Sequence, residues 1–199
     1  MASRQYRMQQ RAEATEETKA RIVQATIQLH DEQGVATTSQ ADVAARAGVA
    51  PATVYRHFPT LGSLVQACGA HIWALMAPPL PEDAPRLFAG IDTTPERLRH
   101  FVAEVCAFYV RGRRRLEGAR EDRSRVPELD GFLRSVEAGL EALAREALAL
   151  ERPTEQQVQL ALALTDFAVW QSLHDHGITE DATPGILVDL LRCALGLAG

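Results

Sequence analysis

The sequence of 199 residues lacks the patterns that mark secreted and membrane-spanning proteins. Its three cysteines lie far apart, and an odd number without a CxxC pair argues against a disulfide scaffold. No apolar run approaches the ~18 residues of a transmembrane helix, and the polar start lacks the hydrophobic segment of a signal peptide. These absences predict a cytoplasmic protein that makes no contact with a membrane.

Catalytic patterns are also missing from the sequence. It contains no nucleophile elbow, no glycine-rich phosphate loop, no His/Glu metal motif and no paired carboxylates in an apolar setting. We therefore expect no enzymatic activity, no catalytic residue, no cofactor and no metal site.

Lysine is almost absent, because 20 of the 21 basic residues are arginine, and the net charge is −5. Residues 1–70 carry seven basic and six acidic side chains, a net charge of +1, which leaves −6 for the remainder. The molecule as a whole is no polycation. Any nucleic acid is therefore expected to bind one local surface.

The periodicity of the sequence is helical, since no alternating strand and no Asn-Gly or Asp-Gly hairpin turn occurs. No charged residue lies between His57 and Pro81, which predicts a helix at 60–76 enclosed by other helices. Four prolines in 77–85 predict a linker or loop. The expected all-α chain has a polar flexible arm at its start, followed by helices near 18–33, 39–47, 51–58, 60–76, 98–109, 133–150, 155–176 and 184–197.

The most informative stretch is Ser39–Phe58, which is typical of two helices joined by a tight turn. Ser39 is a suitable N-cap for the first helix, and Gly48 permits the positive φ of the turn. Pro51 fits the first turn of the second helix. The spacing predicts a helix-turn-helix, in which the second helix enters the major groove of DNA.

These residues resemble the tetracycline-repressor (TetR) family of bacterial transcriptional regulators. The resemblance is specific over residues 18–65 and rests on Ile22-Val23-x-Ala25, Leu29, Gly34, Thr38, the Ser39–Ala44 segment, Ala47-Gly48-Val49, Val54-Tyr55-x-His57-Phe58 and Leu64. It implies a flexible basic arm at 1–17, an N-terminal DNA-binding domain at 18–66 that includes the start of a linking helix, and a helical domain at 67–199 for ligand binding and dimerisation.

The resemblance also implies roles for individual residues. Thr38 and Ser39 would touch phosphate, Ala52 and Thr53 would face base edges, and Tyr55 and His57 would meet the sugar–phosphate backbone. Arg56 is the best candidate for a bidentate contact to guanine or phosphate. The full expected DNA-contacting set is Thr38, Ser39, Gln40, Arg46, Pro51, Ala52, Thr53, Tyr55, Arg56 and His57.

Two positions depart from the family pattern. The family often has an aromatic residue where this chain has His30, which predicts a polar or less tightly packed site there. The family usually carries a lysine where this chain has Leu61, so one phosphate contact is expected to be missing.

Aromatic and apolar side chains of the second domain are candidates for lining an effector cavity, although each alone is more often a core residue. Their composition favours a lipophilic small-molecule effector. The candidates are Trp73, Phe101, Val105, Phe108, Phe132, Phe167 and Trp170.

The two C-terminal helices, near 155–176 and 184–197, are apolar over more than one face. A second apolar stripe predicts a homodimer through this helix pair, with a buried central helix in a monomer as the alternative. We thus expect a homodimeric, ligand-responsive repressor on a palindromic operator. The competing possibility is a helical small-molecule-binding protein or enzyme that keeps the fold and binds no DNA.

Overall fold

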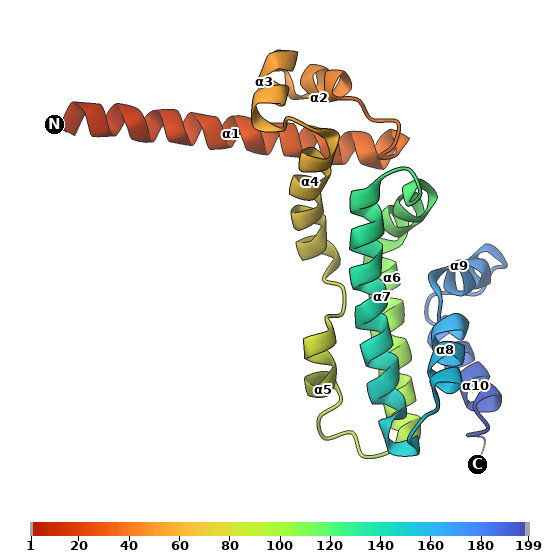
Figure 1. Ribbon diagram of the computed structural model, residues 1–199. Helices are drawn as coiled ribbons and strands as arrows, with labels where there is room; N and C mark the ends of the chain where they lie inside the picture. Colours follow the sequence, from red (N-terminus) through yellow and green to blue (C-terminus); the bar gives the residue numbers. More distant parts are fainter. Residues whose placement is uncertain (1, 198–199) are drawn as a thin grey trace. The chain divides into compact units, whose positions relative to one another are not determined.

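The computed structural model describes residues 2–197, which are helical with short connections and contain no strand (Figure 1). The predicted all-α fold is confirmed. The helices are α1 (Ala2–Gln33), α2 (Gln40–Ala47), α3 (Pro51–His57), α4 (Leu61–Met76), α5 (Ala84–Leu87), α6 (Thr94–Asp122), α7 (Pro127–Leu148), α8 (Glu155–Leu164), α9 (Phe167–Asp175) and α10 (Thr183–Ala194), with 3₁₀ turns at Pro81–Asp83 and Ala149–Glu151.

The chain forms two compact units. The first contains the residues up to Leu75 together with Arg114–Leu133, and the second contains Met76–Arg113 together with the residues from Arg134 onward. Helices α6 and α7 therefore contribute to both units. The division of function between 18–66 and 67–199 stays a prediction, but by its contacts the segment 114–133 is grouped with the N-terminal helices.

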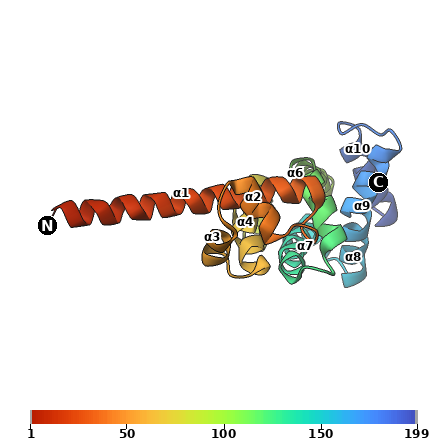
Figure 2. The same ribbon diagram turned by 90° about the horizontal axis from the view of Figure 1, so that it is seen from above.

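The first unit is built around a small apolar core between α1, α2 and α3. The two short helices lie beside the C-terminal half of α1 (Figure 2). Apolar side chains recur at helical spacing on α1 and meet those of α2, α3 and the start of α4. The core members are Ile22, Leu29, Val43, Ala44, Val54, Phe58 and Leu64.

Helix α1 starts at Ala2, so the predicted start of the first helix near residue 18 is wrong, whereas the flexibility expected of the arm at 1–17 stays a prediction. The described side chains of residues 5–17 are all exposed. Since the helix was predicted from apolar residues at helical spacing, and this segment has no such stripe, its helix was missed. The segment nevertheless has no proline or glycine and is rich in alanine, arginine, glutamine and glutamate, which favour helix. Side-chain hydrogen bonds four residues apart add local support, from Gln9 to Glu13 and from Gln10 to Tyr6.

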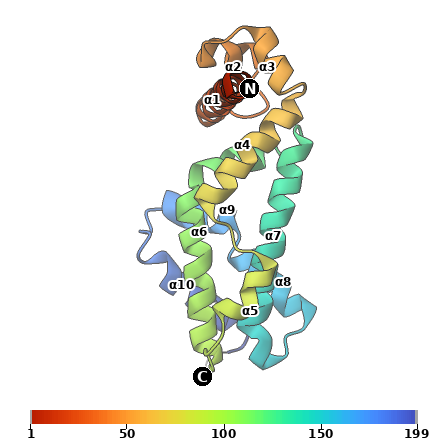
Figure 3. The ribbon, with the colours of Figure 1, turned by 90° about the vertical axis from the view of Figure 1, so that its left-hand side faces the viewer.

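Helix α4 is not enclosed on all sides in the single chain, contrary to the prediction. Leu64, Val65 and Cys68 are buried on its inner face, whereas Ala74 and Leu75 are exposed, the latter to 53%. Helix α4 follows α3 after a sharp change of direction (Figure 3). No single helix among the described residues combines the length and apolarity needed to cross a membrane, although the pair Pro51–His57 and Leu61–Leu87, bent by 72°, meets those two criteria jointly.

The second unit has an aromatic core. The rings of Tyr109 and Phe167 meet edge to face with their centroids 5.3 Å apart. The rings of Phe167 and Trp170 stack with their centroids 5.7 Å apart. The Tyr109 hydroxyl donates to the Thr165 carbonyl at 3.0 Å, which satisfies the polar end of a buried ring. Phe101 and Phe108 of α6 are fully buried in the same unit.

The predicted single helix at 155–176 is two helices, α8 and α9. The Thr165 hydroxyl returns to the Ala161 carbonyl at 2.8 Å, and the Asp166 carboxylate accepts the Ala168 N–H at 2.8 Å as the N-cap of α9. These two polar side chains offer the backbone a helix end and a new helix start. The apolar run on either side concealed the break in the sequence.

Candidate nucleic-acid interface

The start of α2 is fixed by a reciprocal cap, as predicted from Ser39. The Ser39 hydroxyl accepts the Asp42 N–H at 3.1 Å, and the Asp42 carboxylate accepts the Ser39 N–H at 3.1 Å. Hydrogen bonds from Ser39 lower the pKa of Asp42, so the carboxylate that closes the capping box is ionised at neutral pH.

The turn after α2 depends on Gly48, whose φ of 65° lies in the left-handed region. The N–H of Val49 returns to the Ala44 carbonyl at 3.0 Å and closes the turn. This tight reversal brings the next helix against α2, which confirms the predicted helix-turn-helix geometry.

Helix α3 has one buried side and one exposed side. Val54 and the following Phe58 are 0% and 3% exposed, and they hold the helix on the core. The Gln40 amide donates to the Phe58 carbonyl at 2.7 Å and ties the end of α3 to α2. The remaining α3 side chains face outward to different degrees: Pro51, Ala52, Tyr55 and Arg56 are exposed, and Thr53 and His57 are half-buried.

Besides Ser39 and Gln40, two more members of the expected DNA-contacting set have hydrogen-bond partners inside the protein. Thr38 is 3% exposed, and its hydroxyl donates to the Gly34 carbonyl at 2.7 Å. Arg46 donates to both carboxylate oxygens of Glu32, at 2.9 and 2.6 Å, and this pairing lowers the pKa of Glu32. Arg56, by contrast, forms no ion pair within residues 2–197, so its guanidinium is available to a ligand.

A groove of about 570 Å³ runs between α1 and α3 on this side of the unit. Arg11, Arg21 and Arg56 line it, and no carboxylate does. A groove whose charged lining residues are all cations attracts phosphate. The full lining is Arg11, Ala14, Thr15, Thr18, Arg21, Val49, Ala50, Thr53, Arg56 and His57.

The α1 members of this groove were absent from the expected set. Positions 11, 14, 15 and 18 follow the i, i+3, i+4, i+7 spacing of one helix face. That signal is visible only if the first helix is extended back beyond residue 18, so the late predicted start of the helix concealed these residues.

The position where the family usually has lysine holds a half-buried Leu61 at the first residue of α4. Thr60 and Ser63 organise this helix start, since the Ser63 N–H donates to the Thr60 hydroxyl at 3.0 Å. The α4 start therefore offers no side-chain cation at that position.

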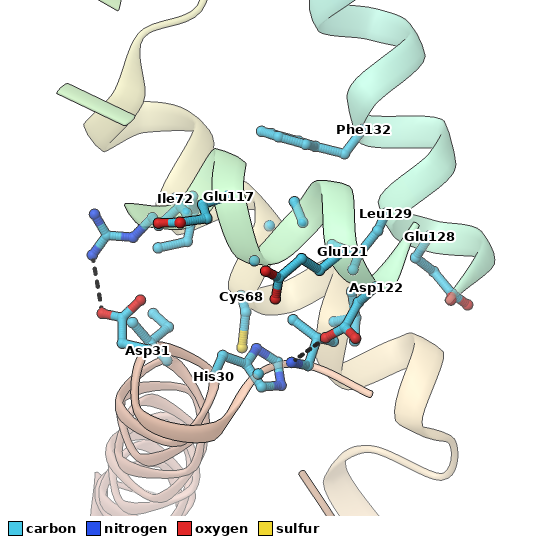
Figure 4. Close-up of a pocket in the computed structure, with 18 of the residues that line it drawn as sticks. His30, Asp31, Cys68, Ile72, Glu117, Glu121, Asp122, Glu128, Leu129 and Phe132 are labelled. Atoms are coloured by element: carbon cyan, nitrogen blue, oxygen red, sulfur yellow. Dashed lines mark hydrogen bonds and ion pairs between the residues drawn. The ribbon is translucent and has the colours of Figure 1, made fainter. Parts of the chain in front are cut away.

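The seven candidate effector residues are separated by the fold. Phe132 lines a cavity of about 630 Å³ in the first unit (Figure 4), and Trp73 contacts the Phe132 ring edge-on at 5.3 Å without lining that cavity. The other five are buried in the second unit and do not line it: Phe101, Val105, Phe108, Phe167 and Trp170.

The N-terminal region is similar to known sequences. Residues 22–68 match the family model described as bacterial regulatory proteins, tetR family. Over 70 residues the chain is 41% identical to an HTH-type transcriptional repressor of Mycobacterium tuberculosis and to an HTH-type transcriptional regulator of Mycobacterium bovis. That match covers 35% of this chain and 37% of each relative, so the likeness in sequence is confined to about a third of either protein.

Solved structures resemble the fold over most of the chain. NalD, the secondary repressor of the MexAB-OprM multidrug efflux pump in Pseudomonas aeruginosa, has a TM-score of 0.63 at 20% identity and covers 89% of this chain and 96% of its own. AmtR of Mycobacterium smegmatis has a TM-score of 0.55 at 22% identity, covering 89% and 86%. At these identities the comparison establishes a shared fold.

Proposed function

We propose that this chain, whose N-terminal domain belongs to the tetR family of bacterial regulatory proteins, is a sequence-specific DNA-binding transcriptional regulator. Helix α3 would enter the major groove with Ala52 and Thr53 toward base edges. The observation that carries the proposal is Arg56, exposed and unpaired on α3 beside a groove lined by arginines and free of carboxylates. A bidentate guanidinium can recognise either guanine or phosphate.

The regulator would act as a homodimer through the segments 155–176 and 184–197, which hold α8, α9 and α10. Leu187 and Leu191 of α10 are fully buried within the chain, whereas Ile186 is half-buried, Leu190 is 43% exposed and Ala194 is exposed. The apolar stripe formed by Ile186, Leu190 and Ala194 thus keeps solvent-exposed area that a partner could cover. The simplest partner is the same surface of another copy of the chain. A two-fold dimer implies a palindromic operator with half-sites about one helical turn apart or slightly more.

The dimer is tested by light scattering at micromolar concentration. The wild type should give a particle of twice 21.8 kDa. A charge at the interface is strongly disfavoured, so Leu190→Glu should give monomers with unchanged helicity. Leu150→Glu is the matched control, because Leu150 is similarly exposed, at 50%, but lies outside α8 and α10. Equal dissociation by both variants, or a wild-type monomer, would exclude this interface.

We further propose that a small-molecule effector regulates DNA binding. The protein would be a transcriptional repressor located in the cytoplasm. An effector shifts the equilibrium between a DNA-binding and a non-binding conformation only by the difference in its affinity for these two states. The competing function is a helical small-molecule-binding protein or enzyme without DNA binding. The cavity of about 630 Å³ in the first unit supports that alternative, because it could hold a small molecule whether or not the protein binds DNA.

DNA binding is tested by selecting duplexes from a random pool and measuring affinity for the enriched sequence by fluorescence anisotropy. Arg56→Ala should weaken binding roughly 5- to 150-fold, which corresponds to about 1–3 kcal/mol for a good bidentate contact. Arg46→Ala should change it less than about threefold, because Glu32 already engages that guanidinium.

Arg86→Ala serves as the control for general charge loss, since Arg86 is an exposed arginine of the second unit. If folded wild-type protein enriches no sequence, the helical ligand-binding alternative is favoured. If Arg56→Ala binds the selected duplex as well as the Arg86→Ala control does, the role assigned to α3 is wrong.

A further inference from the structure

The cavity of the first unit is formed by segments distant in sequence. The end of α1, the inner face of α4, the last turns of α6 and the start of α7 surround it (Figure 4). All of its lining residues belong to the first unit. Its volume of about 630 Å³ lies within the range of small-molecule pockets.

Two helix-interior glycines leave this space open. Gly69 of α4 and Gly118 of α6 both line the cavity, and a Cβ added to either would meet no atom within 4 Å. Glycine destabilises a helix interior relative to alanine, and nothing in the packing requires it at these positions. Glycine at these two positions keeps that part of the cavity free of side-chain atoms.

The lining is apolar on one part and acidic on another. The apolar part includes Ile27, Val65, Ile72, Leu129 and Phe132. Six carboxylates and three arginines also line the cavity, a formal charge of −3. The carboxylates are Asp31, Glu32, Glu117, Glu121, Asp122 and Glu128, and the arginines are Arg114, Arg115 and Arg125.

The three arginines do not neutralise Glu121. Arg115 pairs with Asp31 at 3.4 Å, Arg114 donates to the Asp31 carbonyl, and Arg125 lies 4.0 Å from Asp122. Glu121 is exposed at the mouth and has no ion pair within the described part of the chain. Figure 4 shows its carboxylate extending over the space above Cys68 and His30.

His30 also lines the cavity and contributes a ring nitrogen that has no hydrogen-bond partner. This nitrogen, Nε2, is buried. Burial lowers the pKa of His30 to about 4, in spite of the neighbouring Asp31 and Asp122, so the ring is neutral at pH 7. A neutral imidazole can exchange a hydrogen bond with a polar ligand without repelling a cation.

We propose that this cavity binds a small amphipathic cation, with its hydrocarbon or aromatic part against Ile72, Leu129 and Phe132 and its ammonium group facing Glu121. An apolar surface next to an uncompensated carboxylate favours such a ligand over a neutral or anionic one.

The same site is positioned to act on the helix-turn-helix. Asp122, next to Glu121, accepts the N–H groups of Val35 at 2.8 Å and Ala36 at 2.9 Å, in the turn that leads from α1 to α2. A ligand that displaces Asp122 releases this turn and weakens DNA binding, and DNA weakens ligand binding by the same factor. This coupling rests on the proposed function, whereas the ligand site itself does not.

The two tryptophans allow a test that assigns the site. Trp73 contacts the lining ring of Phe132 in the first unit, and Trp170 lies in the second. In full-length protein labelled with fluorotryptophan, phenylbutylamine should shift the fluorine NMR signal of Trp73 and leave that of Trp170 unchanged. Phenylbutanol should bind up to about fivefold more weakly and phenylbutyrate more weakly still, since a partly exposed ion pair contributes up to about that factor.

Three variants separate charge from space. Glu121→Gln should reduce the affinity for the amine to that for the alcohol, and Glu16→Gln, an exposed change on α1 outside the cavity, should have no effect. Gly118→Leu should abolish binding while the helical circular dichroism is retained. The site is refuted if Trp170 alone responds, if amine and carboxylate bind equally, or if folded Gly118→Leu binds as the wild type does.

The coupling is measured separately by adding the amine to the DNA complex. Release of DNA from the wild type but not from Gly118→Leu supports it. Binding of the amine at Trp73 without any change in DNA affinity overturns the coupling and leaves the site intact. If the protein binds no DNA while the Trp73 response persists, the proposed function fails and the ligand site stands.

Discussion

The two units differ in how their interiors are filled. In the second unit, Phe101, Phe108 and Trp170 are at most 1% exposed, and the rings of Phe108 and Trp170 both contact that of Tyr109. In the first unit, Gly69 and Gly118 face a cavity of about 630 Å³. Buried aromatic rings thus fill the core described in the second unit, whereas two helix-interior glycines line the cavity of the first. An aromatic-rich segment is a poor guide to a cavity when those rings satisfy one another.

The largest effect is expected from opening the filled interior. Phe108→Ala removes a fully buried ring from the second unit and should lower the free energy of unfolding by about 3–5 kcal/mol. Chemical denaturation monitored by circular dichroism measures it. Phe132→Ala, at the half-buried ring beside the existing cavity, should be less damaging. Equal losses from both variants would contradict the contrast between the units.

The first unit should show a pH dependence that originates at His30. The folded protein protonates this ring only near pH 4, whereas the unfolded chain does so near 6.5, so the unfolded state binds more protons between these values. Stability should therefore fall as the pH drops from 6.5 to 4, by roughly 1–3 kcal/mol, with no contribution above 6.5. Denaturation of wild type and His30→Phe across this range measures the difference. His71→Gln, at an exposed histidine, is the control and should retain the wild-type profile.

Glycine-to-alanine changes should have effects of opposite sign in the two units, and the change at Gly118 should have the smallest effect of all. At Gly139 of α7 an added Cβ would overlap the Pro79 carbonyl oxygen, so Gly139→Ala should destabilise the second unit by about 1–3 kcal/mol. At Gly118 the added methyl group meets no atom, and Gly118→Ala should stabilise the first unit by about 0.5–1 kcal/mol. Thermal unfolding of both variants compares them. A loss of stability at Gly118 would mean that the cavity is smaller than described.

The features predicted correctly from the sequence are determined over a few residues. Ser39 caps α2, Gly48 adopts the positive φ, and Pro51 begins α3, each because of a local backbone requirement. The start of α1 was missed because helix formation there leaves no apolar stripe. The break at Thr165 and Asp166 was missed because these two polar residues are flanked on both sides by an apolar run, which favoured one continuous helix.

The cavity could not be predicted in this way. It is lined by residues that lie far apart in the sequence, among them Gly69 and Gly118, which are 49 positions apart. Arg46 pairs with Glu32, which lies 14 residues earlier on another helix, whereas the contact expected between Arg46 and DNA stays a prediction. Which distant residues meet is a property of the tertiary packing, and no periodicity within one helix reports it.

Helix α1 is held differently along its 32 residues. From Ile22 onward, buried side chains anchor it to the core, so amide hydrogens there exchange with solvent only when the unit opens. Residues 5–17 have exposed side chains and local hydrogen bonds alone, so their amides exchange by fraying from the end. Whatever binds the groove containing Arg11 would therefore also slow this fraying, and amide exchange of the first turns would report occupancy of that groove.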